Sequence, residues 1–426
     1  MLFGLLPALS AVSRAATPLA RAGARGTDDR RRRHVWRGLV AVQVAVAMML
    51  ASGAGLLVRS FWRVVSAETG IETAGLVAMS LNLPAGRYPD DPAIAAYHDR
   101  LLADLETLPG VERAGLVTHL PLSGSDASGR MEVEGGPAPA VDAVGYRVTG
   151  GGYFEALGIP VLAGRTFDER DHAGAAHAVV VNRMLAERAW PGQDPLGKRM
   201  TAGGMDRYYA DDRWAMVVGV VADVRHRGPA AAPQPEAFFS YRQRPGRAAD
   251  AVAVVRAAAA PGAVADAVRE AAQRLDPEVP VELTTMDEVA SRALADRRFS
   301  LLLLGSFALL GLGLATLGIY GVVSYRVARR RREMGIRLAL GAEPRRLRNA
   351  VVAGSMRTVA LGLAAGLAGA LALTRLLESL LYEIEPTDPA ALAAAALVLA
   401  AAALWASAVP ARRAARVDPS ETLRSE

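Results

Sequence analysis

The 426-residue chain contains no cysteine. Disulfide bonds, zinc sites built on thiolates and cysteine nucleophiles are therefore excluded. The sequence also lacks the hydrolase motif G-x-S-x-G, the metalloprotease motif H-E-x-x-H and paired C-x-x-C motifs. We therefore expect this chain not to be an enzyme, and we expect no cofactor and no resident metal.

Two segments imitate known sites without supplying their chemistry. Gly192–Lys198 fits the phosphate-loop pattern G-x-x-x-x-G-K, but Arg199 follows where a hydroxyl residue would bind magnesium, and Pro195 removes a backbone amide. This segment is expected to be a turn. The isolated His119 and His226 are expected to be structural. The second segment, which imitates a metal site, contains Asp168, Asp171, His172 and His177. It lacks the i, i+4 spacing of a helical metal site and is expected to be a solvated loop.

The balance of charge is basic, with a net charge of +6 and a pI of about 9.9. The arginines cluster at the edges of apolar runs, where orientation in a membrane explains them better than nucleic-acid binding. A mean hydropathy of +0.19 together with 22% charged residues indicates that membrane segments and a solvated domain are segregated along the chain. No nucleic-acid partner is expected.

Four apolar runs with at most one charged residue are each close to the roughly 20 residues that a helix needs to cross a bilayer. They predict transmembrane helices at 36–58, 299–324, 349–374 and 389–410, in a multi-pass protein of the cell inner membrane. No carboxylate or histidine lies deep in a span, which argues against an ion path. Small residues four apart, Ala51 with Gly55 and Gly362 with Gly366, are expected to pack helix against helix.

Residues 59–298 contain no run apolar enough to cross the bilayer, which predicts a large extracytoplasmic domain between the first and second helices. Between its two ends, an inserted mixed α/β subdomain is expected at about 141–244. Both ends have the pattern of a strand, a helix and a strand, at Gly75–Leu83, Asp91–Leu108 and Val111–Thr118, and again at Ala251–Arg256, Pro261–Leu275 and Val281–Thr285.

The arginine-rich stretch Tyr325–Arg348 lies between the second and third predicted spans. Within it, apolar residues alternate with Glu333 and Arg337 at helical spacing. A short helix along the inner face of the membrane would place its apolar side on the bundle and offer its charges to a soluble partner. The alternative is a basic anchor that only sets orientation.

Residues 1–35 are expected to form a cytoplasmic segment. Leu6-Pro7-Ala8 and the basic, alanine-rich stretch after it echo Val409-Pro410-Ala411 and the C-terminal tail. The echo predicts a remnant of a preceding copy of the same module. Coincidence between two segments rich in alanine and arginine is the alternative.

Several ordered blocks of sequence resemble the FtsX-like/MacB-like permease subunits of ABC systems. The resemblance covers nearly the whole chain from Trp36 onward and is closest to the C-terminal half of the duplicated, ADOP-type orphan permeases. The blocks in the membrane part are Gly318–Tyr325, Arg331–Ala342 and Pro410–Glu426, and those in the external domain are Tyr153–Phe167, Val179–Met200 and Val217–Gly228.

The resemblance implies a membrane α-helical protein with four transmembrane helices. It further implies a large α/β periplasmic core domain at 59–298, made of a porter-like core and the inserted subdomain, and an FtsX-like permease domain at 299–426. Such a permease couples ATP hydrolysis by a separate cytoplasmic ABC ATPase to motion of its periplasmic domain, for export or mechanotransmission. The coupling helix carried over from the family comprises Arg332, Glu333, Met334, Gly335, Ile336, Arg337, Leu338, Leu340 and Gly341.

The resemblance also implies partners. Two such modules form a working unit, so a homodimer or a pairing with a sister permease half is expected within the lipid bilayer, and a periplasmic or envelope partner would meet the external domain. The alternative function is a membrane-anchored sensor or scaffold with an extracytoplasmic binding domain and no ATPase coupling.

Overall fold

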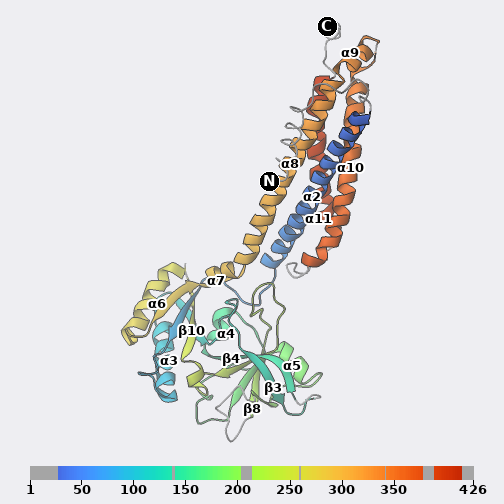
Figure 1. Cartoon of the computed structure of the whole chain (residues 1–426). Coiled ribbons are helices and arrows are strands. Elements are labelled where there is room, and N and C mark those ends of the chain that lie inside the picture. The colour runs from blue at the N-terminus through green and yellow to red at the C-terminus, as the bar shows by residue number, and fades with distance from the viewer. Residues whose placement is uncertain are drawn as a thin grey trace. The chain divides into compact units, whose positions relative to one another are not determined.

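The computed structural model describes residues 27–136, 140–202, 214–258, 261–340, 342–377 and 388–414. The chain divides into two compact units, one of Met1–Phe61 with Phe299–Glu426 and one of Trp62–Arg298. The first is helical and the second is a mixed α/β body (Figure 1). The predicted remnant of a preceding module falls largely on residues before Thr27, outside the described part of the chain.

Four long helices carry the hydrophobic runs: α2 (Thr27–Val65), α8 (Ala295–Arg329), α10 (Pro344–Leu377) and α11 (Pro389–Ala414). Each contains a stretch long and apolar enough to cross a membrane, at Val35–Val65, Ala295–Arg329, Pro344–Leu373 and Pro389–Arg413. The four predicted membrane helices are therefore confirmed as helices. Three of them, α2, α8 and α10, extend beyond their predicted spans at both ends, because flanking charged residues end an apolar run without ending a helix.

Small and aliphatic side chains fill the centre of the helical unit. All four long helices contribute to this cluster, with residues that include Val44, Met48, Ala315, Ile319, Val359 and Leu399. Large apolar side chains also point outward, and Leu309 and Leu317 of α8 are 71% and 68% exposed. A helix that is apolar on its outward face as well as its inward face is typical of a membrane span.

One half of the α/β unit is a four-stranded antiparallel sheet in the order β11-β1-β10-β2. This is the split β-α-β arrangement of ferredoxin-like folds. Both predicted strand–helix–strand patterns are confirmed, and the bounds agree to within two residues, at β1 (Leu76–Asn82), α3 (Asp91–Glu106), β2 (Val111–Val117), β10 (Asp250–Ala257), α6 (Pro261–Leu275) and β11 (Val281–Thr285). The N-cap of α3 is Asp90, whose side chain accepts a hydrogen bond from the Ala93 amide.

The other half of the α/β unit is threaded between β2 and β10 and closes into a ring of six strands. The ring follows the pairing β4-β3-β7-β8-β6-β9, and a parallel pairing of β4 with β9 closes it. Its strands run from Ser128 to Ser240, and the sequence-based bounds of the insertion are 141–244. The strands are β3 (Ser128–Val133), β4 (Ala140–Gly151), β6 (Ala178–Asn182), β7 (Arg199–Thr201), β8 (Ala215–Val221) and β9 (Glu236–Ser240), with β5 (Val161–Gly164) added beside β8.

Side chains along β4 alternate between the two faces of the ring. Val144, Tyr146 and Val148 belong to the main apolar core together with Phe239 of β9, and the Tyr146 and Phe239 rings stack with centroids 4.9 Å apart. Because successive side chains of a strand point to opposite faces, Arg147 lies on the other face of β4. Arg147 therefore points away from the apolar core, toward the loops that contain Asp126 and His226.

Candidate functional sites

The first candidate site is α9 (Arg331–Ala339), the short helix that follows α8. Met334 of α9 and Leu347 of α10 are each 8% exposed and pack together, with Val327 and Val351 beside them. Gly335 is buried as well. These contacts anchor one side of α9 to the ends of α8 and α10, within the helical unit.

The other side of α9 faces outward. Glu333 and Arg337 form an i, i+4 ion pair at 2.7 Å, and their side chains are 47% and 61% exposed. Ile336 and Leu340 are 44% and 82% exposed. This helix and Leu340, which directly follows it, therefore present one ion pair and two aliphatic side chains to their surroundings.

Three residues of the predicted coupling helix are described only in part or not at all. Arg332 and Leu338 lie in α9, but the positions of their side chains are outside the description, and Gly341 lies outside the described residues. The assignment of these nine residues to coupling stays a prediction.

The predicted small residues of α10 lie directly against α2. A Cβ added at Gly362 would come within 2.7 Å of the Ala41 carbonyl oxygen, and one added at Gly366 would come within 2.6 Å of the Met48 Cβ. Such distances leave no room for any side chain, so the two helices approach each other closely at these glycines. Gly55 has more space, with its nearest contact to Ala391 at 3.7 Å.

Ala51 is half-buried beside the apolar cluster of the helical unit. Farther along α2, Arg59 forms an ion pair with Asp388, whose carboxylate also accepts a hydrogen bond from the Ala390 amide at the start of α11. The end of α2 is therefore tied to the beginning of α11 by a charge pair and by an ordinary van der Waals contact of Gly55 with Ala391.

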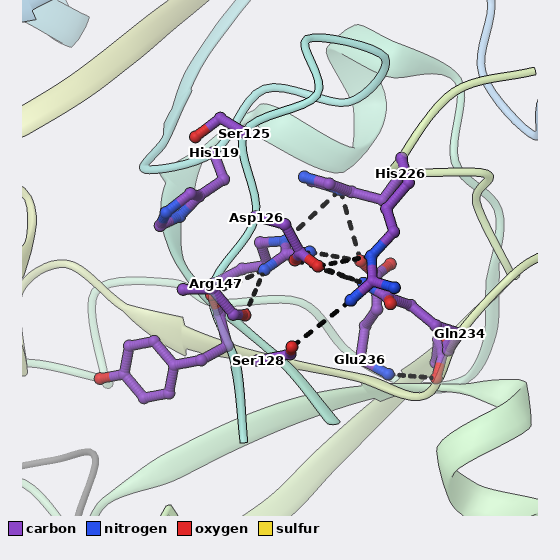
Figure 2. Close-up of polar contacts among 12 residues, drawn as sticks. His119, Ser125, Asp126, Ser128, Arg147, His226, Gln234 and Glu236 are labelled. Atoms are coloured by element: carbon purple, nitrogen blue, oxygen red, sulfur yellow. Dashed lines mark hydrogen bonds and ion pairs between the residues drawn. The ribbon is translucent and has the colours of Figure 1, made fainter. Parts of the chain in front are cut away.

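The second candidate site is a buried ion cluster in the α/β unit, shown in Figure 2. The Arg147 guanidinium, fully buried, donates to Asp126 at 2.5 Å and to Glu236 of β9 at 3.1 Å. It also donates to the carbonyl oxygen of Ala127 at 2.8 Å. His226 lies beside it, with Nδ1 accepting a long bond of 3.4 Å from the Arg147 Nε.

A second arginine closes the cluster from the surface. Arg227 donates to Asp126 at 2.6 Å, and its side chain is 51% exposed. The Gln234 amide also donates to the Asp126 carboxylate, at 3.3 Å. Asp126 therefore connects the loop before β3 to the segment between β8 and β9, and Arg147 connects both to the face of β4 (Figure 2).

Burial sets the protonation of this cluster. It raises the pKa of Glu236 to about 7, because removal of the carboxylate from water outweighs the lowering effect of Arg147. The pKa of His226 is lowered to about 3, mainly by burial and next by the neighbouring Arg147 charge. Burial alone would raise the pKa of Asp126, but the hydrogen bonds and charges of Arg227 and Arg147 outweigh it and lower that pKa. At neutral pH the cluster therefore holds a neutral histidine, an ionised Asp126 and a Glu236 near its titration point.

Of the two segments that imitate known sites, the structure confirms the expectation for one and contradicts part of it for the other. Gly192–Lys198 follows α5 (Arg183–Ala189) and precedes β7, so it has the order helix–loop–strand rather than the strand–loop–helix of a phosphate loop. The expected turn is confirmed. Among the described residues, no group of three or more histidine, aspartate or glutamate side chains is arranged to hold a metal ion.

One of the sequence-based interpretations was wrong. Asp171 does not lie in a solvated loop, since it is 3% exposed and accepts hydrogen bonds from Arg165 at 2.6 and 2.9 Å. His226, which is expected to be structural, lies within the buried ion cluster. In both cases contact with an arginine outside the predicted pattern determines the environment, Arg165 for Asp171 and Arg147 for His226.

Comparisons with known proteins agree with both units. The model of the MacB-like periplasmic core domain matches residues 38–275, and the model of the FtsX-like permease C-terminal domain matches residues 305–419. Among solved structures, the periplasmic region of MacB from Actinobacillus actinomycetemcomitans aligns with a TM-score of 0.36 and 15% identity, covering 54% of this chain and 97% of that one.

Curated relatives are larger proteins. The pyoverdine export ATP-binding/permease protein PvdT of Pseudomonas putida is 29% identical over 283 residues, which cover 63% of this chain and 41% of the relative. The macrolide export ATP-binding/permease protein MacB of Agrobacterium fabrum is 25% identical over 295 residues, covering 67% and 44%. PvdT of Pseudomonas fluorescens is 25% identical over 409 residues, covering 91% and 56%. The chain thus spans about two fifths to just over half of the length of these relatives.

Proposed function

This chain belongs to the family of ABC-type export permeases that combine a MacB-like periplasmic core domain with an FtsX-like permease domain, and we propose that it couples a separate ATPase to motion of that periplasmic domain. In this proposal the ATPase hydrolyses ATP in the cytoplasm, and the four membrane helices transmit the resulting movement. The chain itself catalyses no reaction. The relatives are named export ATP-binding/permease proteins, which supports the pairing with an ATPase.

The observation that carries the proposal is the two-sided placement of α9. Met334 fixes this helix to α8 and α10 and Gly335 is buried, while Glu333, Arg337 and Ile336 face outward. An exposed i, i+4 ion pair contributes only about 0.3–0.5 kcal/mol to its own helix. Stability alone therefore gives little reason for this surface, whereas a partner protein with complementary charge would use both charges and the aliphatic side chains between them.

The test inverts the charges of the outward face without removing them. In the double variant Glu333→Arg and Arg337→Glu, the pair within α9 is retained but a complementary partner meets the opposite charges. We expect the amount of ATPase that co-purifies with the full chain to fall about tenfold or more. The ATPase used is one encoded beside the gene of this chain.

A matched control pair lies at the start of α10. Glu343 and Arg346 form a similar exposed pair at 3.5 Å, with side chains 56% and 87% exposed, and the swap Glu343→Arg with Arg346→Glu should leave co-purification unchanged. Full retention of the ATPase by the α9 swap would refute docking at α9. If the unaltered chain captures no ATPase, the coupling proposal is wrong and the sensor or scaffold alternative is favoured.

A further inference from the structure

The α/β unit contains a cavity of about 320 Å³, all of whose lining residues lie between Val64 and Arg298. One wall is formed by the last residues of α2 and the segment that follows it, up to Thr73. A second wall comes from α7 (Met286–Ala293) and the first turn of α8. Leu122 and Pro229 complete it from two loops. A single water needs only about 10–15 Å³ of such space, so this cavity admits a group of several atoms.

The lining combines an aliphatic surface with charges of both signs. Val64, Leu122 and Leu294 are 0%, 2% and 8% exposed and form the apolar part. Arg298 and Asp287 also line the cavity, and the Arg298 Nη1 donates to the Ser291 hydroxyl at 3.2 Å. A ligand that satisfies such a surface carries an anionic group and a cationic group close together, attached to an aliphatic part.

The position of the lining residues in the chain relates the cavity to a lipid surface. Val64 and Val65 are the last residues of the candidate span Val35–Val65, and Arg298 lies at the start of the candidate span Ala295–Arg329. Trp62, two residues before Val64, is 67% exposed. Tryptophan and arginine at the ends of spans are typical of the headgroup layer, where zwitterionic phospholipids are the abundant amphiphiles.

Two features hold the loop wall in place. Leu122 has a left-handed backbone conformation, with φ of 66°, that non-glycine residues rarely adopt. Its amide donates to the His226 carbonyl oxygen at 2.7 Å. The ion cluster of Asp126 and Arg227 joins the same two loops a few residues away. A strained residue retained by its surroundings at a cavity wall is typical of a preformed site.

We propose that this cavity binds the headgroup of a phosphatidylethanolamine-type phospholipid. Arg298 receives the phosphate, Asp287 receives the ammonium group, and the glycerol and upper acyl carbons lie along Val64 and Leu294. The assignment goes beyond the coupling proposal, because it concerns the α/β unit and requires no ATPase.

The experiment is native mass spectrometry of the full chain in detergent, with dioleoyl phosphatidylethanolamine and dioleoyl phosphatidylglycerol added in equal amounts. The unaltered chain should retain phosphatidylethanolamine in preference to phosphatidylglycerol. In Asp287→Asn the ratio of bound phosphatidylethanolamine to bound phosphatidylglycerol should fall about tenfold. The reason is that the ammonium group of phosphatidylethanolamine loses its carboxylate partner, whereas phosphatidylglycerol has no ammonium group. In Arg298→Ala the retention of both lipids should fall by a similar factor, because both carry the phosphate.

Matched controls lie on the same two helices. Arg292→Ala on α7 and Asp296→Asn on α8 replace exposed residues that do not line the cavity, and both should keep the lipid ratio of the unaltered chain. Equal retention of the two lipids by the unaltered chain would overturn the proposal. So would a loss of preference in the control variants as large as in Asp287→Asn, or a loss of total lipid retention as large as in Arg298→Ala.

Discussion

Replacement of Arg147 by methionine tests whether the buried ion cluster stabilises the α/β unit. Arg147 is fully buried and serves two carboxylates, Asp126 and Glu236, whose side chains are 14% and 1% exposed. It also donates to the backbone carbonyls of Ala127 and Tyr146 at 2.8 and 3.0 Å. Methionine preserves much of the side-chain volume but donates to none of these four acceptors.

The magnitude follows from what stays behind. Removing one partner of a buried ion pair typically costs about 3–5 kcal/mol, because the remaining charge is left without compensation. Asp126 keeps its contact with Arg227 at 2.6 Å and lies partly in water, so most of the cost falls on Glu236. Since a domain of this kind is stable by about 5–15 kcal/mol, the variant should lose about a fifth or more of its stability at pH 8.

The cost should depend on pH with a definite sign. Without Arg147 the already raised pKa of Glu236 rises further, because the nearby positive charge that favoured ionisation is gone. At pH 5 Glu236 is protonated in both proteins, and the variant loses only hydrogen bonds, about 1–3 kcal/mol. At pH 8 the carboxylate must either ionise without a partner or hold its proton, so the loss increases to about 3–5 kcal/mol.

The assay is native-state hydrogen exchange of peptides from β4 and β9 in the full chain, at both pH values. Arg130→Met serves as the control, because Arg130 forms a surface pair with Asp142 at 3.7 Å, with both side chains more than 60% exposed, 67% and 78%. Such a pair contributes at most about 1 kcal/mol. If Arg147→Met and Arg130→Met lower protection equally, the ion cluster is not a major source of stability and the reasoning fails.

Two further predictions use the same molecule. The native pKa of Glu236, about 7, exceeds its ordinary value of 4.5, so stability falls as pH rises through this window; between pH 4.5 and 7.5 the free energy of unfolding of Glu236→Gln, measured with denaturant, should therefore increase by about 3 kcal/mol relative to that of the unaltered chain. In the helical unit, Gly366→Leu places atoms where the Met48 Cβ lies within 2.6 Å and should lower the stability by about 1–3 kcal/mol in thermal unfolding. Gly354→Leu, with open space around the added Cβ, should have no such effect.

The sequence predicts the elements that depend on local patterns. Long apolar runs identify the membrane helices. Short apolar runs with turn residues identify both β1 and β11 to within one residue. The close helix contact at Gly362 and Gly366 follows from a spacing that is readable without a structure. These features depend on residues that are near neighbours in the chain.

The closed ring and the ion cluster depend on pairs that are distant in the chain. Arg147 meets Asp126, 21 residues away, and Glu236, 89 residues away. Their meeting depends on the parallel pairing of β4 with β9, in which Gly145 lies opposite Glu236. A single arginine in a strand pattern carries no signal of its partner, so neither the buried cluster nor the burial of His226 could be predicted from local spacing.

The connections between the two units have a mechanical consequence for the proposed coupling. The segment after α2 leads into β1, and β11 leads into α7 and then α8, so both connections start from neighbouring strands. β1 and β11 are hydrogen-bonded along five residue pairs, from Val77 with Thr285 to Leu81 with Val281. Because a paired ladder resists sliding, a displacement of α2 relative to α8 is opposed by this strand pair. We infer that motion of the two helices is transmitted to the α/β unit as movement of the whole body rather than as separation of its strands.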